Sequence, residues 1–281
     1  MKKLAVLGHP IGHTLSPVMH NASIKALGLA ADYEYSKLDV PPGELIVRLE
    51  QLSSEGYAGV NLTIPLKEVA FKGLKNLADS ARILGAVNTV EFSKNGLIGH
   101  NTDGYGFLKA LEEAFGKTVE GDSVFVLGCG GAGRAVALMA ALNGAQSITL
   151  ADVDADRVEN LSAEIGRLAP EVGIFQCLEK STQIELCRDT DLVIQASPVG
   201  MKKEDPSLLP VGAFRKGQRV FDLIYMYPET ACLSNAKASG AQIANGLGML
   251  LHQGAKAFNI WTGIEPDIGA MRKALEKAVY S

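Results

Sequence analysis

Asp122-Ser-Val-Phe-Val-Leu127 leads directly into Gly128-Cys-Gly-Gly-Ala-Gly133, and an alanine-rich stretch follows to about Leu142. The pattern predicts a buried strand, a glycine-rich turn and a helix, in that order. Glycines at these positions let backbone N–H groups approach a pyrophosphate at the helix N-terminus, which is typical of dinucleotide-binding domains. A turn with a structural role only is the alternative interpretation, and the strand-turn-helix context argues against it.

The residues after this helix bear on the choice of dinucleotide. A strand is predicted over 147–152, and Asp152 ends it, where an acid accepts hydrogen bonds from the ribose hydroxyls of NAD and repels a 2′-phosphate. Arg157 is the opposing signal, because a cation there could pair with the 2′-phosphate of NADP. The sequence therefore favours NAD over NADP. We expect the cofactor to contact Gly128, Gly130, Gly131, Ala132, Gly133, Asp152 and Arg157.

Strands and helices alternate on both sides of this unit, as in α/β proteins with mainly parallel sheets. Strands are predicted over 4–7, 33–38, 59–62, 87–92, 192–196 and 220–223, and helices over 17–27, 43–52, 103–115 and 248–262. Ser16 is a plausible N-cap for the helix at 17–27. Asn95-Gly96 predicts a hairpin between 87–92 and 97–100.

The expected fold class is α/β with two domains, since 281 residues of which 47% are hydrophobic can supply two cores. Residues 1–103, joined by C-terminal helices at about 248–281, would form an N-terminal α/β substrate domain. Residues 104–247 would form a Rossmann-like NAD(P)-binding domain. The active site is expected in the cleft between the two domains.

Composition excludes several classes of function. With 27 basic and 31 acidic residues the net charge is -4, so the chain has no general excess of cations for a nucleic-acid backbone. The apolar stretch before Gly8 is too short for a signal peptide or a membrane span. The four cysteines form no CxxC pair, which predicts reduced thiols and a cytoplasmic protein.

No metal site is predicted. Asp152-Val-Asp-Ala-Asp156 begins like a calcium loop, but Arg157 stands where that loop needs glycine and Ala163 where it needs glutamate. His9 and His13 are spaced like a helical metal pair, yet Pro10 and Gly12 argue against a helix there.

Polar residues in apolar or glycine-rich surroundings mark the first third of the chain. They are Thr14 and Ser16, Asn61 to Lys67, Asn88-Thr89, and Asn101-Thr102-Asp103. Several follow predicted strands, where the ligand-facing groups of open α/β sheets collect. This mixture of hydroxyl, amide and cationic donors would suit a hydroxylated carboxylic acid.

Five stretches of the chain resemble, in the same order, the shikimate and quinate-shikimate dehydrogenase family. They are Gly8-His-Pro-Ile-Gly-His-Thr-Leu-Ser-Pro-Val-Met-His-Asn21, Val60-Asn-Leu-Thr-Ile-Pro-Leu-Lys67, Gly85-Ala-Val-Asn-Thr89, Gly99-His-Asn-Thr-Asp-Gly-Tyr-Gly-Phe107 and Gly246-Leu-Gly-Met-Leu-Leu-His-Gln-Gly254. The resemblance implies a catalytic pair, Lys67 and Asp103. It implies substrate contacts at Thr14, Ser16, Thr63, Asn88, Tyr225 and Gln253.

The implied reaction is the NAD(P)-dependent, reversible oxidation of shikimate to 3-dehydroshikimate, and by extension of quinate to 3-dehydroquinate, within aromatic amino acid biosynthesis through the chorismate pathway. Ketone reduction by hydride leaves an alkoxide that needs a proton, which Lys67 can supply while Asp103 orients the amine. Which of the two is the formal acid or base is left open.

Each residue also has a structural interpretation. Lys67 could be a solvated lysine at a helix start, Asp103 a helix N-cap, and Thr14 and Ser16 turn and cap residues. Asn88 and Gln253 could instead satisfy buried backbone groups.

Two departures from the family pattern matter. Ala151-Asp152-Val153-Asp154 replaces the Asn-Arg-Thr-like segment of NADP-using members and resembles the NAD-using quinate-shikimate dehydrogenases. Thr14 stands where many members have serine, and one methyl group discriminates substrates by only about 1 to 3 kcal/mol, so shikimate and quinate both remain candidates. A catalytically inactive dinucleotide-dependent sensor, or a dehydrogenase for another hydroxy acid, is the alternative function. A monomer and a homodimer are both compatible with the sequence.

Overall fold

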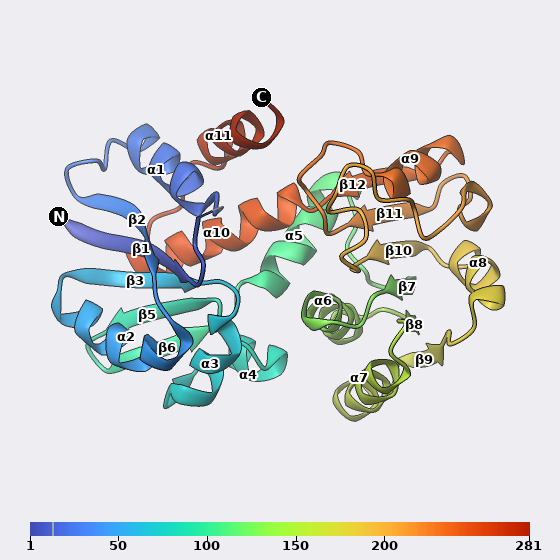
Figure 1. Ribbon diagram of the computed structural model, residues 1–281, viewed down its shortest axis with the longest axis horizontal. Coiled ribbons are helices and arrows are strands. Elements are labelled where there is room, and N and C mark those ends of the chain that lie inside the picture. Colours follow the sequence, from blue (N-terminus) through green and yellow to red (C-terminus); the bar gives the residue numbers. More distant parts are fainter. Residues whose placement is uncertain (13) are drawn as a thin grey trace. The chain divides into compact units, whose positions relative to one another are not determined.

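The structure is a computed structural model that describes residues 1–12 and 14–281 and divides into two compact units, each with its own six-stranded sheet (Figure 1). The first unit comprises Met1–Gly106, Leu250–Val279 and Ser281, and the second comprises Phe107–Met249 and Tyr280. His13, one of the two histidines weighed above as a metal pair, lies outside the described residues. No described helix is both long enough and apolar enough to cross a membrane.

The sheet of the first unit has the order β2-β1-β3-β5-β6-β4. Its strands are β1 (Lys2–Gly8), β2 (Tyr33–Asp39), β3 (Tyr57–Leu62), β4 (Asn76–Leu77), β5 (Thr89–Ser93) and β6 (Gly96–His100). β1 pairs in parallel with β2 and β3, whereas β5 is antiparallel to both β3 and β6. The β5–β6 pair confirms the hairpin predicted from Asn95-Gly96.

Helices cover both faces of this sheet, because side chains of successive residues in a strand point to opposite faces. The helices are α1 (Ser16–Ala26), η1 (Pro42–Glu44), α2 (Leu45–Ser54), α3 (Leu66–Gly73), α4 (Asp79–Leu84), α10 (Leu247–Thr262) and α11 (Ile268–Tyr280). Leu7 of β1 packs in a cluster with α2 and α3, whereas Leu4 packs in another with α1 and α10. In that second cluster the indole N–H of Trp261 donates to the Val90 carbonyl at 3.0 Å, close against Gly59.

The predicted N-cap role of Ser16 is wrong. α1 begins at Ser16 itself. Leu15 occupies the N-cap position, and its side chain makes no capping hydrogen bond. The backbone N–H of Ser16 donates to Thr14 Oγ1 at 3.4 Å, so the hydroxyl that serves the helix start comes from Thr14. Pro17 lies within the first turn, where its missing N–H costs nothing.

The second unit has an entirely parallel sheet with the order β12-β11-β10-β7-β8-β9. Its strands are β7 (Ser123–Leu127), β8 (Ser147–Ala151), β9 (Gly173–Gln176), β10 (Leu192–Gln195), β11 (Arg219–Asp222) and β12 (Gln242–Asn245). Its helices are α5 (Asp103–Phe115), whose first residues belong to the first unit, α6 (Gly131–Leu142), α7 (Ala155–Leu168), α8 (Lys180–Arg188), η2 (Val211–Ala213) and α9 (Ala231–Ala238). The predicted α/β class, with two sheets, is confirmed.

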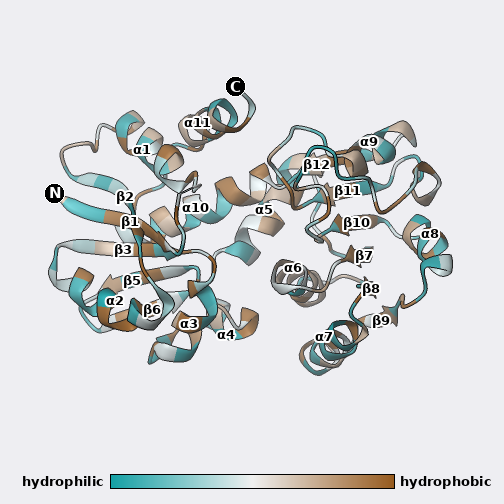
Figure 2. Ribbon diagram, viewed as in Figure 1, coloured by the Kyte–Doolittle hydropathy of each residue, from teal (hydrophilic) through white to brown (hydrophobic). Residues whose placement is uncertain are grey.

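The strands of the second sheet read as hydrophobic runs because helices bury both faces of a parallel sheet. Every residue of β10 and β11 is buried, and β7 and β10 carry mostly the hydrophobic colour in Figure 2. Polar residues at the carboxyl ends of these strands and in the following loops are therefore the ones available to a ligand.

Candidate active site

A lysine and an aspartate form a close ion pair in the first unit. Lys67 Nζ donates to Asp103 Oδ2 at 2.6 Å, and the two side chains are 30% and 19% exposed. Lys67 is the second residue of α3, and Asp103 is the first residue of α5. The geometry leaves the ammonium two further hydrogens and a solvent-accessible side, which is what a group that moves a proton to a bound oxygen needs.

The carboxylate of Asp103 is held on its other oxygen by an amide. Asn88 Nδ2 donates to Asp103 Oδ1 at 2.9 Å and faces Gln253 Oε1 at 3.4 Å. The backbone N–H of Asp103 donates to Asn101 Oδ1 at 2.9 Å, so Asn101, not Asp103, provides the side-chain acceptor at the start of α5. The N-cap interpretation of Asp103 is therefore wrong, and its carboxylate is directed to Lys67 and Asn88.

The serine and threonine hydroxyls predicted to contact substrate lie in the same unit, in two separate segments. Thr14 Oγ1 donates to Ser16 Oγ at 3.3 Å just before and within the first turn of α1. Thr63 follows β3, and its backbone N–H donates to Leu7 O at 2.9 Å. A side chain on Gly8 would approach Thr63 Cγ2 to 2.6 Å, so glycine at position 8 lets the threonine lie close to β1.

Three residues beyond the predicted set lie behind Asn88. Thr102 donates its backbone N–H to Asn88 Oδ1 at 2.8 Å, Thr89 donates its hydroxyl to the same oxygen at 2.9 Å, and Asn61 Nδ2 donates to Thr89 Oγ1 at 3.0 Å. All three are at most 5% exposed. The sequence marked these residues as polar groups in apolar segments, but it gave no sign that they hydrogen-bond to one another.

The glycine-rich turn lies between β7 and α6 in the second unit. Gly128 has φ +104°, and a side chain on it would lie 2.7 Å from Ser197 N. A side chain on Gly133 would collide with the Gly128 carbonyl, so helix and strand pack closely there. A side chain on Gly131 would meet nothing, and one on Gly130 would meet only the Arg157 guanidinium, at 3.9 Å. The protein's own packing thus explains glycine at 128 and 133, while the open space at 130 and 131 suits a pyrophosphate against the N-terminus of α6.

Opposite charges lie next to this turn. Asp152 follows β8, and its carboxylate accepts the N–H of Cys129 at 2.6 Å and that of Asp154 at 3.0 Å. Arg157 Nε lies 3.2 Å from Asp154 Oδ2, and both of these side chains are largely exposed. The structure therefore places the predicted acid and the predicted cation at the same turn.

The remaining predicted contact, Tyr225, lies in the second unit after β11, and burial raises the pKa of its phenol. The loop that carries it is anchored by Asp222, whose carboxylate accepts the Thr230 hydroxyl at 2.6 Å and the Ile224 N–H at 3.0 Å. Burial raises the pKa of Asp222 to about 6. Tyr225 and the glycine turn belong to the second unit, and the residues around Lys67 belong to the first, so the predicted site residues form two groups.

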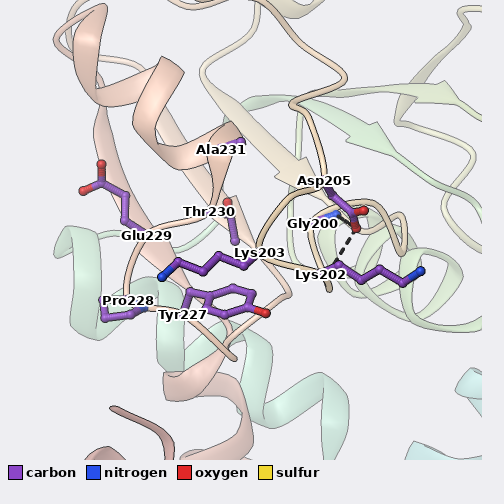
Figure 3. Close-up of a pocket in the computed structure, with 9 residues that line it drawn as sticks. All are labelled: Gly200, Lys202, Lys203, Asp205, Tyr227, Pro228, Glu229, Thr230 and Ala231. Atoms are coloured by element: carbon purple, nitrogen blue, oxygen red, sulfur yellow. Dashed lines mark hydrogen bonds between the residues drawn. The ribbon is translucent and has the colours of Figure 1, made fainter. Parts of the chain in front are cut away.

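A pocket of about 330 Å³ lies in the second unit, beside the loops that follow β10 and β11. Figure 3 shows the residues that line it. Lys203 extends alongside the Tyr227 ring there, and Asp205 Oδ2 accepts the backbone N–H groups of Gly200 and Lys202. None of the predicted site residues lines this pocket.

The fold and the site define a two-domain α/β oxidoreductase that uses a dinucleotide cofactor. Residues 6–90 match the family model described as the shikimate dehydrogenase substrate binding domain, and residues 246–276 match that of the shikimate 5′-dehydrogenase C-terminal domain. A shikimate dehydrogenase (NADP(+)) of Methanopyrus kandleri is 40% identical over 97% of this chain and 94% of its own length. The chain belongs to the shikimate dehydrogenase family.

Three solved structures of proteins with different names share the fold of this chain. The shikimate 5-dehydrogenase of Listeria monocytogenes in complex with shikimate and NAD has a TM-score of 0.90 and 33% identity, and the match covers 98% of this chain and 96% of that one. The quinate dehydrogenase of Corynebacterium glutamicum in complex with NAD has a TM-score of 0.88 and 31% identity, covering 98% and 99%. A 5-ketofructose reductase of Gluconobacter has a TM-score of 0.88 and 32% identity, covering 99% and 98%.

Proposed function

We propose that the chain catalyses the reversible, NAD(P)-dependent oxidation of shikimate to 3-dehydroshikimate. The observation that carries the proposal is the Lys67–Asp103 ion pair at 2.6 Å, with Asn88 bound to the second oxygen of the same carboxylate. A sensor that only binds its ligand has no physical need for such a pair. The relatives described above are named for this reaction or for closely similar ones.

A nicotinamide dinucleotide held at the glycine turn would supply the hydride chemistry, and the residues of the chain transfer the proton. Lys67 Nζ, as the neutral amine, takes the proton from the substrate hydroxyl during oxidation, and the resulting ammonium returns it to the oxyanion during reduction. Asp103 orients the amine through its 2.6 Å contact, and Asn88 keeps the carboxylate from rotating. Thr14, Ser16, Thr63, Gln253 and Tyr225 are the proposed contacts to the carboxylate and the other hydroxyls of the substrate.

The decisive experiment is an initial-rate assay at the absorbance band of the reduced nicotinamide. Shikimate, quinate and 5-ketofructose should each be tested with both dinucleotides, in the direction that suits each compound. Turnover of shikimate supports the proposal, and the ratio of quinate to shikimate turnover decides whether the chain also acts as a quinate dehydrogenase. Turnover of 5-ketofructose alone would reject shikimate as the substrate. Dinucleotide binding without any turnover would favour the sensor.

We further propose NAD as the preferred dinucleotide, because the Asp152 carboxylate lies at the glycine turn where the adenosine ribose would lie. The support is divided, since the Methanopyrus kandleri relative is named for NADP(+) while the Listeria and Corynebacterium structures contain NAD. Arg157 lies at the same turn and would favour a 2′-phosphate.

Replacing Asp152 by asparagine should raise the ratio of kcat/KM for NADP+ to that for NAD+ by about tenfold or more, because the charge that repels a 2′-phosphate is removed and the side-chain shape is retained. The matched control is Asp156→Asn, an exposed acid in the first turn of α7, which should leave the ratio within about twofold. A wild-type enzyme that already prefers NADP+ would contradict the NAD assignment.

A further inference from the structure

A buried chain of hydrogen bonds runs from β2 to the Lys67–Asp103 pair. It begins at Tyr35, whose hydroxyl donates to Asn61 Oδ1 at 2.7 Å. It continues through Asn61 and Thr89 to Asn88, and these four side chains are at most 5% exposed. Because no solvent competes for these groups, each donor has to find a protein acceptor, so the direction of each bond can be worked out.

The orientation of the Asn61 amide is fixed by a backbone carbonyl. Asn61 Nδ2 lies 3.1 Å from the Asn88 carbonyl oxygen, which can only accept, so the nitrogen must face it. Asn61 Oδ1 then faces Tyr35, and the phenol must be the donor. The second hydrogen of Asn61 Nδ2 is directed at Thr89 Oγ1, 3.0 Å away.

The orientation of Asn61 determines which way the Thr89 hydroxyl donates, and Thr89 in turn determines the orientation of Asn88. Its oxygen already accepts from Asn61, so its own hydrogen is free for Asn88 Oδ1 at 2.9 Å. The backbone N–H of Thr102, which can only donate, reaches the same Oδ1 at 2.8 Å. With two donors on its oxygen, Asn88 must present its nitrogen to Asp103 Oδ1 and Thr102 Oγ1, each at 2.9 Å, with Gln253 Oε1 farther away at 3.4 Å.

We propose that Thr89 and Tyr35 are positioning residues that act through Asn88, holding its amide so that an N–H always faces the carboxylate of Asp103. This inference rests on the function proposed above. In the reversed orientation the amide oxygen of Asn88 would face the carboxylate oxygen of Asp103. Two acceptors repel each other, so Asp103 could not be held in line with Lys67. Neither Thr89 nor Tyr35 touches the ion pair itself, and both act through the intervening amide.

The test compares two replacements of Thr89. Thr89→Val keeps the shape and removes the hydroxyl, and Thr89→Ser keeps the hydroxyl and removes a methyl group. We expect kcat for shikimate to fall about tenfold in Thr89→Val while KM stays within about twofold, because the amide no longer holds Asp103 in line with Lys67. Thr89→Ser should keep the wild-type kcat even if its melting temperature falls. Equal kcat values in the two variants would overturn the proposal.

A double-mutant cycle shows whether Thr89 acts through Asn88. In the background of Asn88→Ala, adding Thr89→Val should cost less than about twofold, because the amide that it positions is gone. A full additional tenfold loss there would mean that Thr89 acts by another route, and the proposal would fall. Tyr35→Phe should repeat the effect of Thr89→Val in weaker form, whereas the control Tyr33→Phe, on the same strand, should not.

A readout that needs no catalysis separates this inference from the proposed function. The side-chain NH2 signal of Asn88 in a 15N spectrum, identified by its loss in Asn88→Ala, should exchange slowly with solvent in the wild type and in Thr89→Ser. It should exchange at least about tenfold faster in Thr89→Val. If the wild type turns over no substrate but these signals behave as stated, the proposed function fails while the positioning stands. If the signal of Thr89→Val matches the wild type, the positioning fails alone.

Discussion

Lys67→Ala should lower kcat for shikimate oxidation by about two to four orders of magnitude, the usual loss when a positioned proton-transfer group is removed. The alanine also removes the cation that pairs with the Asp103 carboxylate, while the hydrogen bond from Asn88 remains. Binding of the reduced dinucleotide, followed by its fluorescence, should be unchanged, because the glycine turn belongs to the second unit. The measurement is a steady-state rate at saturating concentrations of both substrates.

The matched control is Lys72→Ala, an exposed lysine in the last turn of the same helix, α3. It should retain the wild-type rate within about twofold, because a solvated lysine contributes little beyond its own helix. If Lys67→Ala behaved like Lys72→Ala, position 67 would be a solvated lysine at a helix start and not a catalytic residue.

His20→Phe should remove a large part of the acid sensitivity of the fold. His20 is fully buried, and both of its ring nitrogens lack a hydrogen-bond partner among the described residues. Its ring stacks on Tyr35 at 4.2 Å and lies near Phe258 and Trp261. Burial lowers the pKa of His20 to about 3, and the neighbouring Asn61 acts in the opposite direction with a smaller effect.

The sign of the effect follows from this lowered pKa. The unfolded chain takes up a proton at His20 below about pH 6.5 and the folded chain does not, so stability is lost as the pH falls toward 3. Between about pH 7 and about pH 4.5 this single group should cost about 2 to 3 kcal/mol of unfolding free energy. Urea unfolding of the wild type and of His20→Phe at both pH values measures the difference.

A histidine elsewhere provides the comparison for this experiment. His9 is about half exposed and pairs with Asp39. His9→Gln should therefore still lose the stability that protonation of His20 in the unfolded chain removes at low pH. If His20→Phe and the wild type lost equal stability on acidification, the ring would have to be accommodated as a cation in the fold, against its apolar surroundings.

Periodicity and turn chemistry were sufficient to predict most elements of the fold. The strand, glycine turn and helix at 122–142 were predicted to within a residue or two, because β7 is a continuous buried run and α6 starts at the glycines. β9 and β12 were missed. Each has only four residues, and the exposed or half-exposed side chains of these edge strands give no apolar pattern to detect.

The sequence likewise predicted some residues of the candidate site and missed others. The resemblance to the family supplied Lys67, Asp103 and Asn88, which the structure brings together within hydrogen-bond distance. The link from Tyr35 to Thr89 could not be predicted, because it joins side chains of β2, β3 and β5, which come together only when the sheet forms in the order β2-β1-β3-β5. The N-cap of α1 was predicted one residue too late, at Ser16 and not at Leu15, since Thr14 and Ser16 carry the same hydroxyl group and only the backbone geometry shows that Thr14 accepts the Ser16 N–H.

The indole packed on Gly59 has a practical consequence. Trp261 is the chain's one tryptophan, and it is buried in the first unit with its N–H bonded to Val90. Its emission therefore reports the integrity of the first unit and none of the second, whereas far-ultraviolet circular dichroism reports both. Denaturation curves recorded with the two signals will coincide if the units unfold together and will separate if the dinucleotide-binding unit melts on its own.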